Sequence, residues 1–374
     1  MKILIAPNSF KESADSNEVC NLFLKYLSKN NSLSFETLPI SDGGDGFLNT
    51  CRSVFGLKIL KYKITTPFDE SQFECNIGYN ERTRQVFIES ARILGLRVIP
   101  KEKRNPLYLS SKGIGDIFLK LIDEVERKKL AIEEVVIGIG GTGTNDFGLG
   151  VCSRFGLELY DIYGKKDKIL PEFFYRVKTL KWEKFQLPFN IKNVIDVNNP
   201  LLGAKGATRT FGRQKGADKG EIEVMELGFH KILNLLKNSE LDISDKELSG
   251  AGGGLAAGFQ IFFDASLIKA QDFIINQLNL EEKIKGADII LTGEGSFDEQ
   301  TLEGKGSGIV LNLATKLNKR VILCCGKVDD KVKVKLGDNI EIFEFISFFN
   351  SPEESINNFE KGVEQVCGNI TSIL

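Results

Sequence analysis

Carboxylate side chains recur beside glycines at the ends of several predicted strands. The members of this set are Asp42, Asp146, Asp196, Glu294 and Asp298. Carboxylates can hold a hydrated Mg²⁺, and one carboxylate can accept the proton of a hydroxyl group. Lysines in glycine-rich loops could neutralise phosphate oxygens, and the candidates are Lys11, Lys215 and Lys305. This combination indicates phosphate chemistry, because phosphoryl transfer depends mainly on positioning and electrostatics.

A glycine-rich loop follows the predicted buried strand Val135–Ile139. Its glycines let the backbone approach a ligand closely and expose amide donors. Residues Gly138–Gly143 also satisfy the pattern G-x-G-x-x-G, and Asp161 follows at about the spacing of a dinucleotide-binding fingerprint. An NAD-dependent oxidoreductase of a small hydroxy acid is therefore one hypothesis for this chain. A second glycine-rich turn spans Gly250–Gly258.

The established nucleotide motifs do not account for this set of residues. Gly304 and Lys305 are followed by Gly306, so the chain lacks the Ser or Thr that completes a P-loop. The sequence also lacks the H-R-D and D-F-G signatures of protein kinases. Its single histidine, His230, lies on a helical pattern, which argues against Ser-His-Asp catalysis.

Composition limits the class of protein. A chain of 374 residues, 42% of them hydrophobic, is long enough for two globular domains. A net charge of -2 without a basic stripe argues against a nucleic-acid partner. We expect no membrane segment, because no apolar run reaches spanning length and Lys2–Ala6 already reads as a strand. The 7 cysteines form no C-x-x-C pair, which predicts a reduced, cytoplasmic protein.

The two ends of the chain resemble each other, and the middle differs. Both ends alternate predicted strands and helices, with polar loops where the strands end. In the middle, three strand-like runs follow in quick succession, which favours a mixed or antiparallel sheet. We expect an α/β protein whose discontinuous Rossmann- or flavodoxin-like, doubly wound domain comprises residues 1–70 and 287–374. A mixed α/β domain of residues 71–286 would be inserted into it.

Seven blocks, in order along nearly the whole chain, resemble the bacterial-type glycerate kinases. Each block is modest alone, but their joint order is specific. The blocks are Ala6–Lys11, Ser41–Gly46, Ile139–Asp146, Asp196–Leu201, Phe211–Ala217, Gly250–Gly254 and Thr292–Thr301.

This resemblance implies an ATP- and Mg²⁺-dependent kinase of D-glycerate, with two α/β domains and an active site in the cleft between them. The acidic positions of the family fall on Asp42, Asp196, Glu294 and Asp298. We expect Asp196, or else Asp42, to accept the hydroxyl proton, and Glu294 and Asp298 to orient Mg²⁺, mainly through water.

The remaining site residues are a hypothesis from their types and their places in these loops. We expect Ser9, Lys11, Asn145 and Asp146 to bind glycerate near Asp42. Lys11 would also act in catalysis, by pairing its charge with the substrate carboxylate or a phosphate. The residues expected to bind nucleotide or phosphate are Gly140, Gly141, Thr142, Lys215, Gly252, Gly253 and Lys305. Three of the proposed groups have simpler alternative roles: Asp298 as a helix cap, Lys305 as a surface lysine and Lys215 as a solvated loop charge.

Several positions depart from the pattern of the family. Asn8 stands where an aspartate is usual, and Phe147 replaces a glycine. Arg213 and Ser307 occupy positions that are often proline. Phe147 could reshape a substrate pocket or face the core, and the sequence leaves both open. It also leaves open a non-catalytic sensor of a sugar acid, the oligomeric state, and phosphorylation of the 2- or the 3-hydroxyl group.

Overall fold

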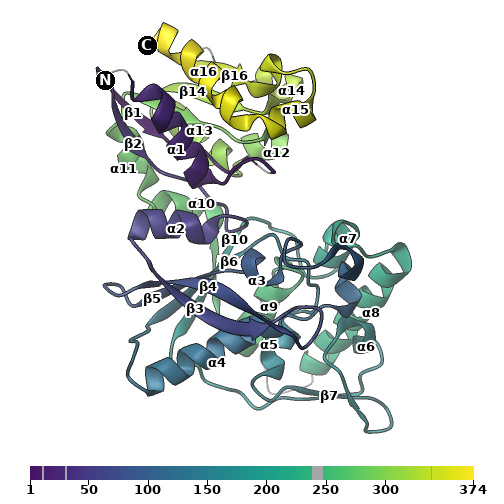
Figure 1. Ribbon diagram of the computed structural model, residues 1–374. Coiled ribbons are helices and arrows are strands. Elements are labelled where there is room, and N and C mark those ends of the chain that lie inside the picture. Colours follow the sequence, from purple (N-terminus) through teal and green to yellow (C-terminus); the bar gives the residue numbers. More distant parts are fainter. Residues whose placement is uncertain (11, 30–31, 238–246, 338) are drawn as a thin grey trace. The chain divides into compact units, whose positions relative to one another are not determined.

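The computed structural model describes residues 1–10, 12–29, 32–237, 247–337 and 339–374. The chain divides into two units, and the first is built from both ends of the sequence, Met1–Gly56 and Lys269–Leu374. The second unit is the continuous segment Leu57–Ile268. Figure 1 shows the purple and yellow ends of the chain together in the first unit.

These boundaries differ from the expected 70/71 and 286/287. Residues 57–70 join the second unit because β3 (Lys58–Thr65) pairs along its length with β4 (Gln72–Asn80). Residues 269–286 join the first unit, where α11 (Leu280–Lys285) packs against α13 (Ser307–Lys316). Strand pairing and helix packing thus set both boundaries.

The first unit is organised on a parallel sheet in the order β16-β14-β12-β1-β2. Its strands are β1 (Lys2–Ile5), β2 (Ser34–Thr37), β12 (Ile289–Thr292), β14 (Arg320–Cys325) and β16 (Ile340–Glu344). Numbered along the chain within this unit, the order is 2-1-3-4-5, the flavodoxin-like arrangement. The order reverses between β1 and β12, and such a switch point is where open α/β sheets bind ligands.

Both faces of this sheet are buried, as expected for a doubly wound fold. On one face, Ile3 and Ile5 pack in a cluster with Val19 and Phe23 of α1 (Ser16–Leu27) and with α16 (Phe359–Ile373). Leu4, which points to the other face, is equally buried. The remaining helices and short strands of the unit are α2 (Phe47–Phe55), α10 (Ala270–Asp272), α12 (Glu299–Leu302), α14 (Asp330–Lys333), α15 (Pro352–Asn357), β13 (Ser296–Phe297) and β15 (Lys327–Val328).

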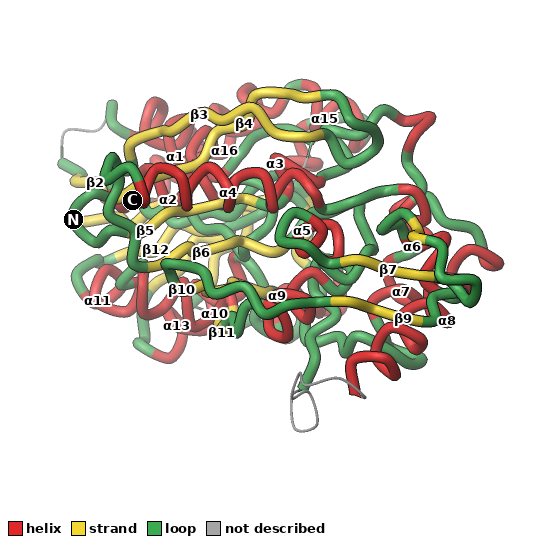
Figure 2. The backbone as a smooth tube through the Cα atoms, turned by 90° about the horizontal axis from the view of Figure 1, so that it is seen from below, coloured by secondary structure: helices red, strands yellow, loops and turns green. Residues whose placement is uncertain are grey.

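The second unit contains a mixed six-stranded sheet in the order β11-β10-β6-β5-β4-β3. Strands β10 (Asn190–Ile195), β6 (Glu134–Ile139) and β5 (Gln85–Glu89) are parallel, and β4 and β3 continue the sheet antiparallel. The edge strand β11 (Ser266–Lys269) completes it. The two expected sheet types, one doubly wound and one mixed, are therefore confirmed. Figure 2 shows β5, β6 and β10 as neighbouring yellow segments.

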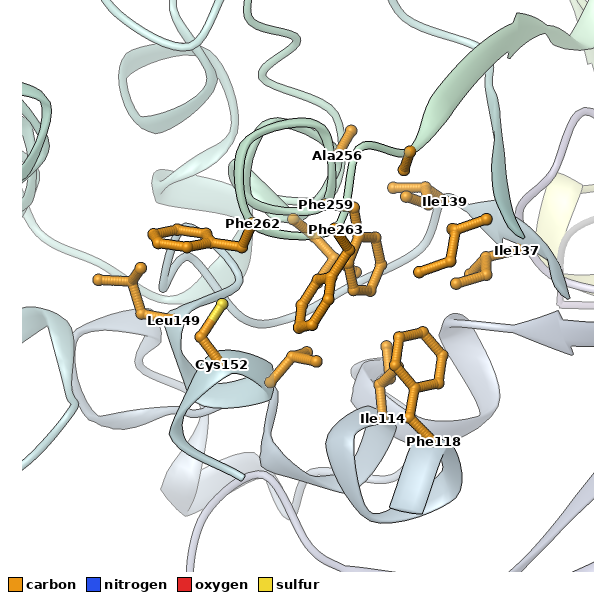
Figure 3. Packing of buried hydrophobic residues seen from close by; sticks show 14 of the residues in the cluster. Ile114, Phe118, Ile137, Ile139, Leu149, Cys152, Ala256, Phe259, Phe262 and Phe263 are labelled. Atoms are coloured by element: carbon orange, nitrogen blue, oxygen red, sulfur yellow. The ribbon is translucent and has the colours of Figure 1, made fainter. Parts of the chain in front are cut away.

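The main core of the second unit lies between this sheet and two helices, α4 (Lys112–Glu126) and α9 (Leu255–Phe262). Phe118 of α4 stacks on Phe259 of α9 with ring centroids 5.7 Å apart, beside Ile137 of β6 (Figure 3). The other elements of this unit are α3 (Ala91–Leu94), α5 (Leu149–Ser153), α6 (Pro171–Phe174), α7 (Ala207–Phe211), α8 (Lys219–Lys237) and the small sheet of β7 (Glu158–Tyr160), β8 (Lys166–Asp167) and β9 (Thr179–Lys181).

Candidate active site

The loops after β1 and β12 lie side by side at the switch point of the first unit. The Asn8 amide N–H donates to the Gly293 carbonyl at 2.9 Å, and the Thr292 hydroxyl donates to the Ala6 carbonyl at 2.7 Å. The Ser9 amide N–H donates to Asn8 Oδ1 at 2.8 Å, so Asn8 organises its own loop. This is the edge of the sheet at which the sequence predicted a ligand.

Glu294 is oriented at this switch point by the N-terminus of α13. The Ser307 hydroxyl, fully buried, donates to Glu294 Oε1 at 2.9 Å. A Cβ on Gly306, whose φ is +47°, would lie 2.3 Å from Asn8 Nδ2 and 3.3 Å from Glu294 Oε2. Asn8, Glu294, Gly306 and Ser307 are therefore in close contact, and we call them the switch-point cluster. Proline at position 307 would remove the hydroxyl donor to Glu294.

Asp42 lies in the loop that follows β2, beside the loop that follows β1. The Ile40 amide N–H donates to the Pro7 carbonyl at 2.9 Å, which joins the two loops. Asp42 itself is half-buried, and its Oδ1 accepts the Gly44 amide N–H at 3.3 Å. The strand order thus places Asp42 on the same edge of the sheet as the switch-point cluster, while Lys11 falls outside the described residues.

Asp298 and Lys305 flank the helix α12. Asp298 is exposed and caps this helix, since its Oδ1 accepts the Thr301 amide N–H at 3.0 Å and the Thr301 hydroxyl at 3.3 Å. The contacts of Asp298 are therefore those of a helix cap. Lys305 is half-buried in the turn between α12 and α13. The metal contact of Asp298 and the phosphate contact of Lys305 stay predictions.

In the second unit, β6 and β10 bring two predicted site segments to one edge of the sheet. The strands are parallel with Ile139 opposite Ile195, so Gly140 and Asp196 both come directly after the last pair. Asp196 is half-buried. Glu226 is a buried residue of α8. It anchors the loop after Asp196 by accepting the Gly203 amide N–H at 2.8 Å.

Asp146 organises the loop that follows β6. Its carboxylate accepts the Ser111 amide N–H at 2.7 Å and the Ser111 hydroxyl at 2.8 Å. The amides of Gly148 and Gly150 donate to it at 3.2 and 3.1 Å. Burial raises the pKa of the Asp146 carboxyl group above its usual value, although these hydrogen bonds lower it in part. Because both oxygens accept hydrogen bonds from the protein, the side chain holds the loop in place, and its contact with substrate stays a prediction.

Asn145 and the second glycine-rich turn form the next contact of this loop. Asn145 is fully buried, and its Nδ2 donates to the Thr208 hydroxyl at 3.0 Å. Gly253, with φ +69°, lies so close that a Cβ there would be 2.3 Å from the Thr144 carbonyl oxygen. Gly252, with φ +66°, is similarly close to Ile139. The glycines expected to face phosphate thus also serve the packing of one loop on the other.

Lys215 lies under the same loop and not in solvent. Only 4% of its surface is exposed, and its Nζ donates to the Thr144 carbonyl at 2.7 Å and to the Thr142 hydroxyl at 3.3 Å. Burial lowers the pKa of Lys215 to about 7, and the nearby Asp146 carboxylate raises it in part. The interpretation of Lys215 as a solvated loop charge is therefore wrong. Its expected contact with phosphate stays a prediction.

Phe147 faces the core. It is fully buried and packs on Phe229 of α8 with ring centroids 5.3 Å apart. Gly254 and Gly258 of the following turn and helix lie against its backbone. Of the two roles open from the sequence, the structure shows the packing role.

The dinucleotide fingerprint lacks its structural context. In such folds the glycine motif opens a helix, but α5 begins at Leu149, beyond Gly143. Asp161 lies in the turn between β7 and β8, where its Oδ1 accepts the amides of Tyr163 and Lys165, each at 2.9 Å. The glycine motif therefore lacks the helix that a dinucleotide site needs, and Asp161 has a local structural role.

The sequence did not indicate the contacts of four residues: Ser111, Thr208, Glu226 and Ser307. Ser111 was expected only as a helix cap, and Ser307 was noted only as a departure from the family pattern. Glu226 had a signal, because it shares a helical face with buried Ile222, Met225 and Phe229. A carboxylate on an apolar face needs a polar partner. The other three are ordinary Ser and Thr residues, whose partners come from distant segments.

A sheet with flavodoxin-like strand order and oxygen-rich loops at its switch point is typical of an α/β protein that binds a ligand at the carboxyl ends of its strands. The family model of the glycerate kinase family matches residues 3–374, and the chain belongs to this family. It is 30% identical to a glycerate kinase of Neisseria meningitidis serogroup B over 100% of this chain and 99% of the relative. It is 29% identical to the glycerate 2-kinase of Escherichia coli K12 over 100% and 98%.

A crystal structure from Salmonella typhimurium LT2, named "putative glycerate kinase 2", shares the fold. It has a TM-score of 0.75 and 27% sequence identity, and the match covers 100% of this chain and 98% of that one. Membership of this family implies an ATP-dependent phosphotransferase. In the part of the chain that the structure describes, no helix is long and apolar enough to cross a membrane.

Proposed function

We propose that this protein transfers the γ-phosphoryl group of ATP to a hydroxyl group of D-glycerate, giving phosphoglycerate and ADP. The observation that carries the proposal is family membership over residues 3–374, together with Glu294 held at the switch point of the sheet. The reaction needs anion-binding groups, a metal and a proton acceptor more than a covalent intermediate. The cell compartment that we propose is the cytoplasm, since all seven cysteines are free and buried.

Proton transfer is assigned to a carboxylate. Asp196, at the end of β10, is the proposed acceptor of the hydroxyl proton, with Asp42 as the second candidate. Both are half-buried at the ends of strands, which suits a group that must meet a substrate. Ser9, Lys11 and Asn145 are proposed to contact glycerate.

Mg²⁺ fits the chemistry of the switch-point cluster. The cluster offers a carboxylate whose orientation is fixed, Glu294, and further oxygens on Asn8 and Ser307. Mg²⁺ takes oxygen ligands and commonly keeps several waters, so one or two carboxylates suffice. No group of three or more His, Cys, Asp or Glu side chains able to hold a metal occurs among the described residues. We therefore propose that Glu294, with Asp298 as a second carboxylate, holds Mg²⁺ mainly through water; the ion would neutralise charge on the transferred phosphate.

A coupled assay of ADP release tests the proposal. We expect release that requires ATP, Mg²⁺ and D-glycerate together. Phosphorus NMR of the product would then assign the 2- or the 3-hydroxyl group. Reduction of NAD by a hydroxy acid without ATP would instead support the oxidoreductase. Stabilisation by D-glycerate without ADP release would indicate a binding protein.

The carboxylate roles can be tested with Asp42→Asn, Asp196→Asn and Glu294→Gln. Each substitution keeps the shape of the side chain and removes its charge. We expect each to lower kcat by about 10²-fold or more, as for loss of an acid–base or charge-stabilising group, while the melting temperature changes little. Near-normal turnover in all three variants would show that the site is elsewhere.

A further inference from the structure

Lys215 is a buried cation that the chain holds beneath a proposed ligand loop. It lies in the turn between α7 and α8, and its side chain enters the loop between β6 and α5. Other polar contacts of the described residues also hold that loop. They include those from Ser111 to Asp146, from Asn145 to Thr208, and from the Gly143 amide N–H to the Leu94 carbonyl at 2.6 Å. Lys215 brings the only cation among these contacts.

The two acceptors of Lys215 have different consequences. The Thr144 carbonyl, 2.7 Å from Nζ, is a main-chain acceptor, so this bond fixes the path of the loop. The Thr142 hydroxyl, 3.3 Å from Nζ, accepts through its oxygen, and its own proton remains free to be donated onward. A hydroxyl that accepts from a cation becomes a stronger donor, because hydrogen bonds in a chain polarise one another.

Thr142 retains slight access to the surface. It is 7% exposed, against 4% for Lys215, and it directly follows Gly141, which is exposed and has φ +63°. Thr142 therefore lies nearer the surface than the Lys215 ammonium, which lies one hydrogen bond further in.

We propose that Lys215 acts on an anionic substrate through Thr142, as a positioning and polarising residue, and makes no direct contact with it. This inference rests on the proposed function for the identity of the anion, a carboxylate or a phosphate oxygen. The relay changes the role expected from the sequence, where Lys215 was itself a phosphate ligand.

The charged surroundings of Lys215 are simple. Asp146, on the same loop, is the charged group that acts on it. Arg104 packs its carbonyl against Gly216, but its guanidinium donates to the Leu96 and Ile99 carbonyls at 2.6 and 3.1 Å. A pKa near 7 for Lys215 means that its charge changes within the ordinary assay range.

A double-mutant cycle tests the relay, with Lys215→Met, Thr142→Val and the double variant. Valine keeps the shape of threonine and removes the hydroxyl group. We expect each single variant to raise the KM of one substrate about 10-fold, and the double variant to be no worse than the poorer single one, because both remove the same path. Thr142→Ser, which keeps the hydroxyl group, should raise the KM much less than Thr142→Val does. The matched control is Lys219→Met, because Lys219 is exposed.

The pH dependence of KM distinguishes the relay from a purely structural role of Lys215. In the wild type, the KM of that substrate should rise as the pH increases from about 6 to about 8.5, and the rise should vanish in Thr142→Val and in Lys215→Met. Measuring KM for ATP and for D-glycerate separately identifies the anion. Additive effects in the cycle would overturn the relay. A normal KM in Thr142→Val would overturn it as well, and this second result holds even if Lys215→Met fails to fold.

Binding measurements separate the failure of the relay from failure of the proposed function. The rise in melting temperature with ATP or with D-glycerate is recorded for each variant without turnover. If ATP stabilises the wild type and Thr142→Val equally, and D-glycerate does too, the relay is wrong. If the wild type binds ATP but releases no ADP with D-glycerate, the proposed function is wrong, while a weakened ATP shift in Thr142→Val still supports the relay. A wild type stabilised by neither compound overturns both.

Discussion

The Ser307 hydroxyl donates to Glu294 Oε1 at 2.9 Å, which joins the N-terminus of a helix to the loop after a central strand. Glu294 follows β12, and Ser307 is the first residue of α13. The bond fixes one carboxylate oxygen at the point where the strand order of the sheet reverses. A carboxylate fixed in this way meets a metal ion with little further ordering, which favours catalysis through preorganisation.

Removing the Ser307 hydroxyl group should therefore impair catalysis. A hydrogen bond to a charged group contributes about 1.5–3 kcal/mol, so Ser307→Ala should lower kcat/KM by roughly 10- to 100-fold and raise the Mg²⁺ concentration needed for half-maximal activity. Steady-state kinetics across a Mg²⁺ titration measures both effects. Ser307→Thr should recover most of the activity, and Ser372→Ala, at an exposed position, should behave as wild type. Unchanged Mg²⁺ dependence in Ser307→Ala would count against this role.

Replacing Gly253 should be costly because two loops meet there. Its φ is +69°, and a Cβ would lie 2.3 Å from the Thr144 carbonyl oxygen and 2.7 Å from Asn145 Cα. Gly164 has a similar φ of +72° but open space around its Cβ position. We expect Gly164→Ala to cost about 1 kcal/mol through the backbone alone, and Gly253→Ala to cost about 2–3 kcal/mol more, because overpacking adds strain. Urea denaturation of both variants gives the comparison, and equal losses would refute the close approach.

Asp146 should matter first for stability. Asp146→Asn places an amide N–H₂ group against donors from Ser111, Gly148 and Gly150, which leaves buried groups unsatisfied. We expect a loss of about 3 kcal/mol in the free energy of unfolding. Asp161→Asn is the control, since an amide oxygen can still accept the two turn amides. A stable but inactive Asp146→Asn variant would instead favour the direct substrate contact expected from the sequence.

Lys215 should make stability depend on pH. Its pKa falls to about 7 on folding, so between this value and its higher unfolded value the unfolded chain binds more protons. The contribution of Lys215 to stability is therefore lowest below about pH 7 and increases as the pH rises. Lys215→Met should remove this slope. Comparing urea denaturation of wild type and variant at pH 6.5, 7.5 and 8.5, values chosen to span the window in steps of about one unit, isolates the effect; parallel curves would contradict it.

The sequence by itself determined the layered architecture. Apolar runs such as Ile3–Ala6 and Ile289–Leu291, each followed by glycines or polar residues, predict buried parallel strands with loops at one edge. The ordered blocks, which need no coordinates, indicated the family, and full-length membership confirms it. The same local signals located Asp42, Asp196 and Glu294 at strand ends.

Only the tertiary structure decided what each side chain contacts. The local signals for Asp146 and Lys215 matched those of ligand-binding residues, but burial among distant segments gives both internal partners. The pairing of β3 with β4 and the packing of α11 on α13 place the boundaries between the units at 56/57 and 268/269. Hydrogen bonds such as that from Ser307 to Glu294 join residues whose spacing carries no periodic signal. The physical reason is that a polar side chain bonds to whichever partner the folded chain brings within hydrogen-bonding distance, and that partner can come from any segment. Apolar periodicity, in contrast, depends only on the local order of residues along the chain.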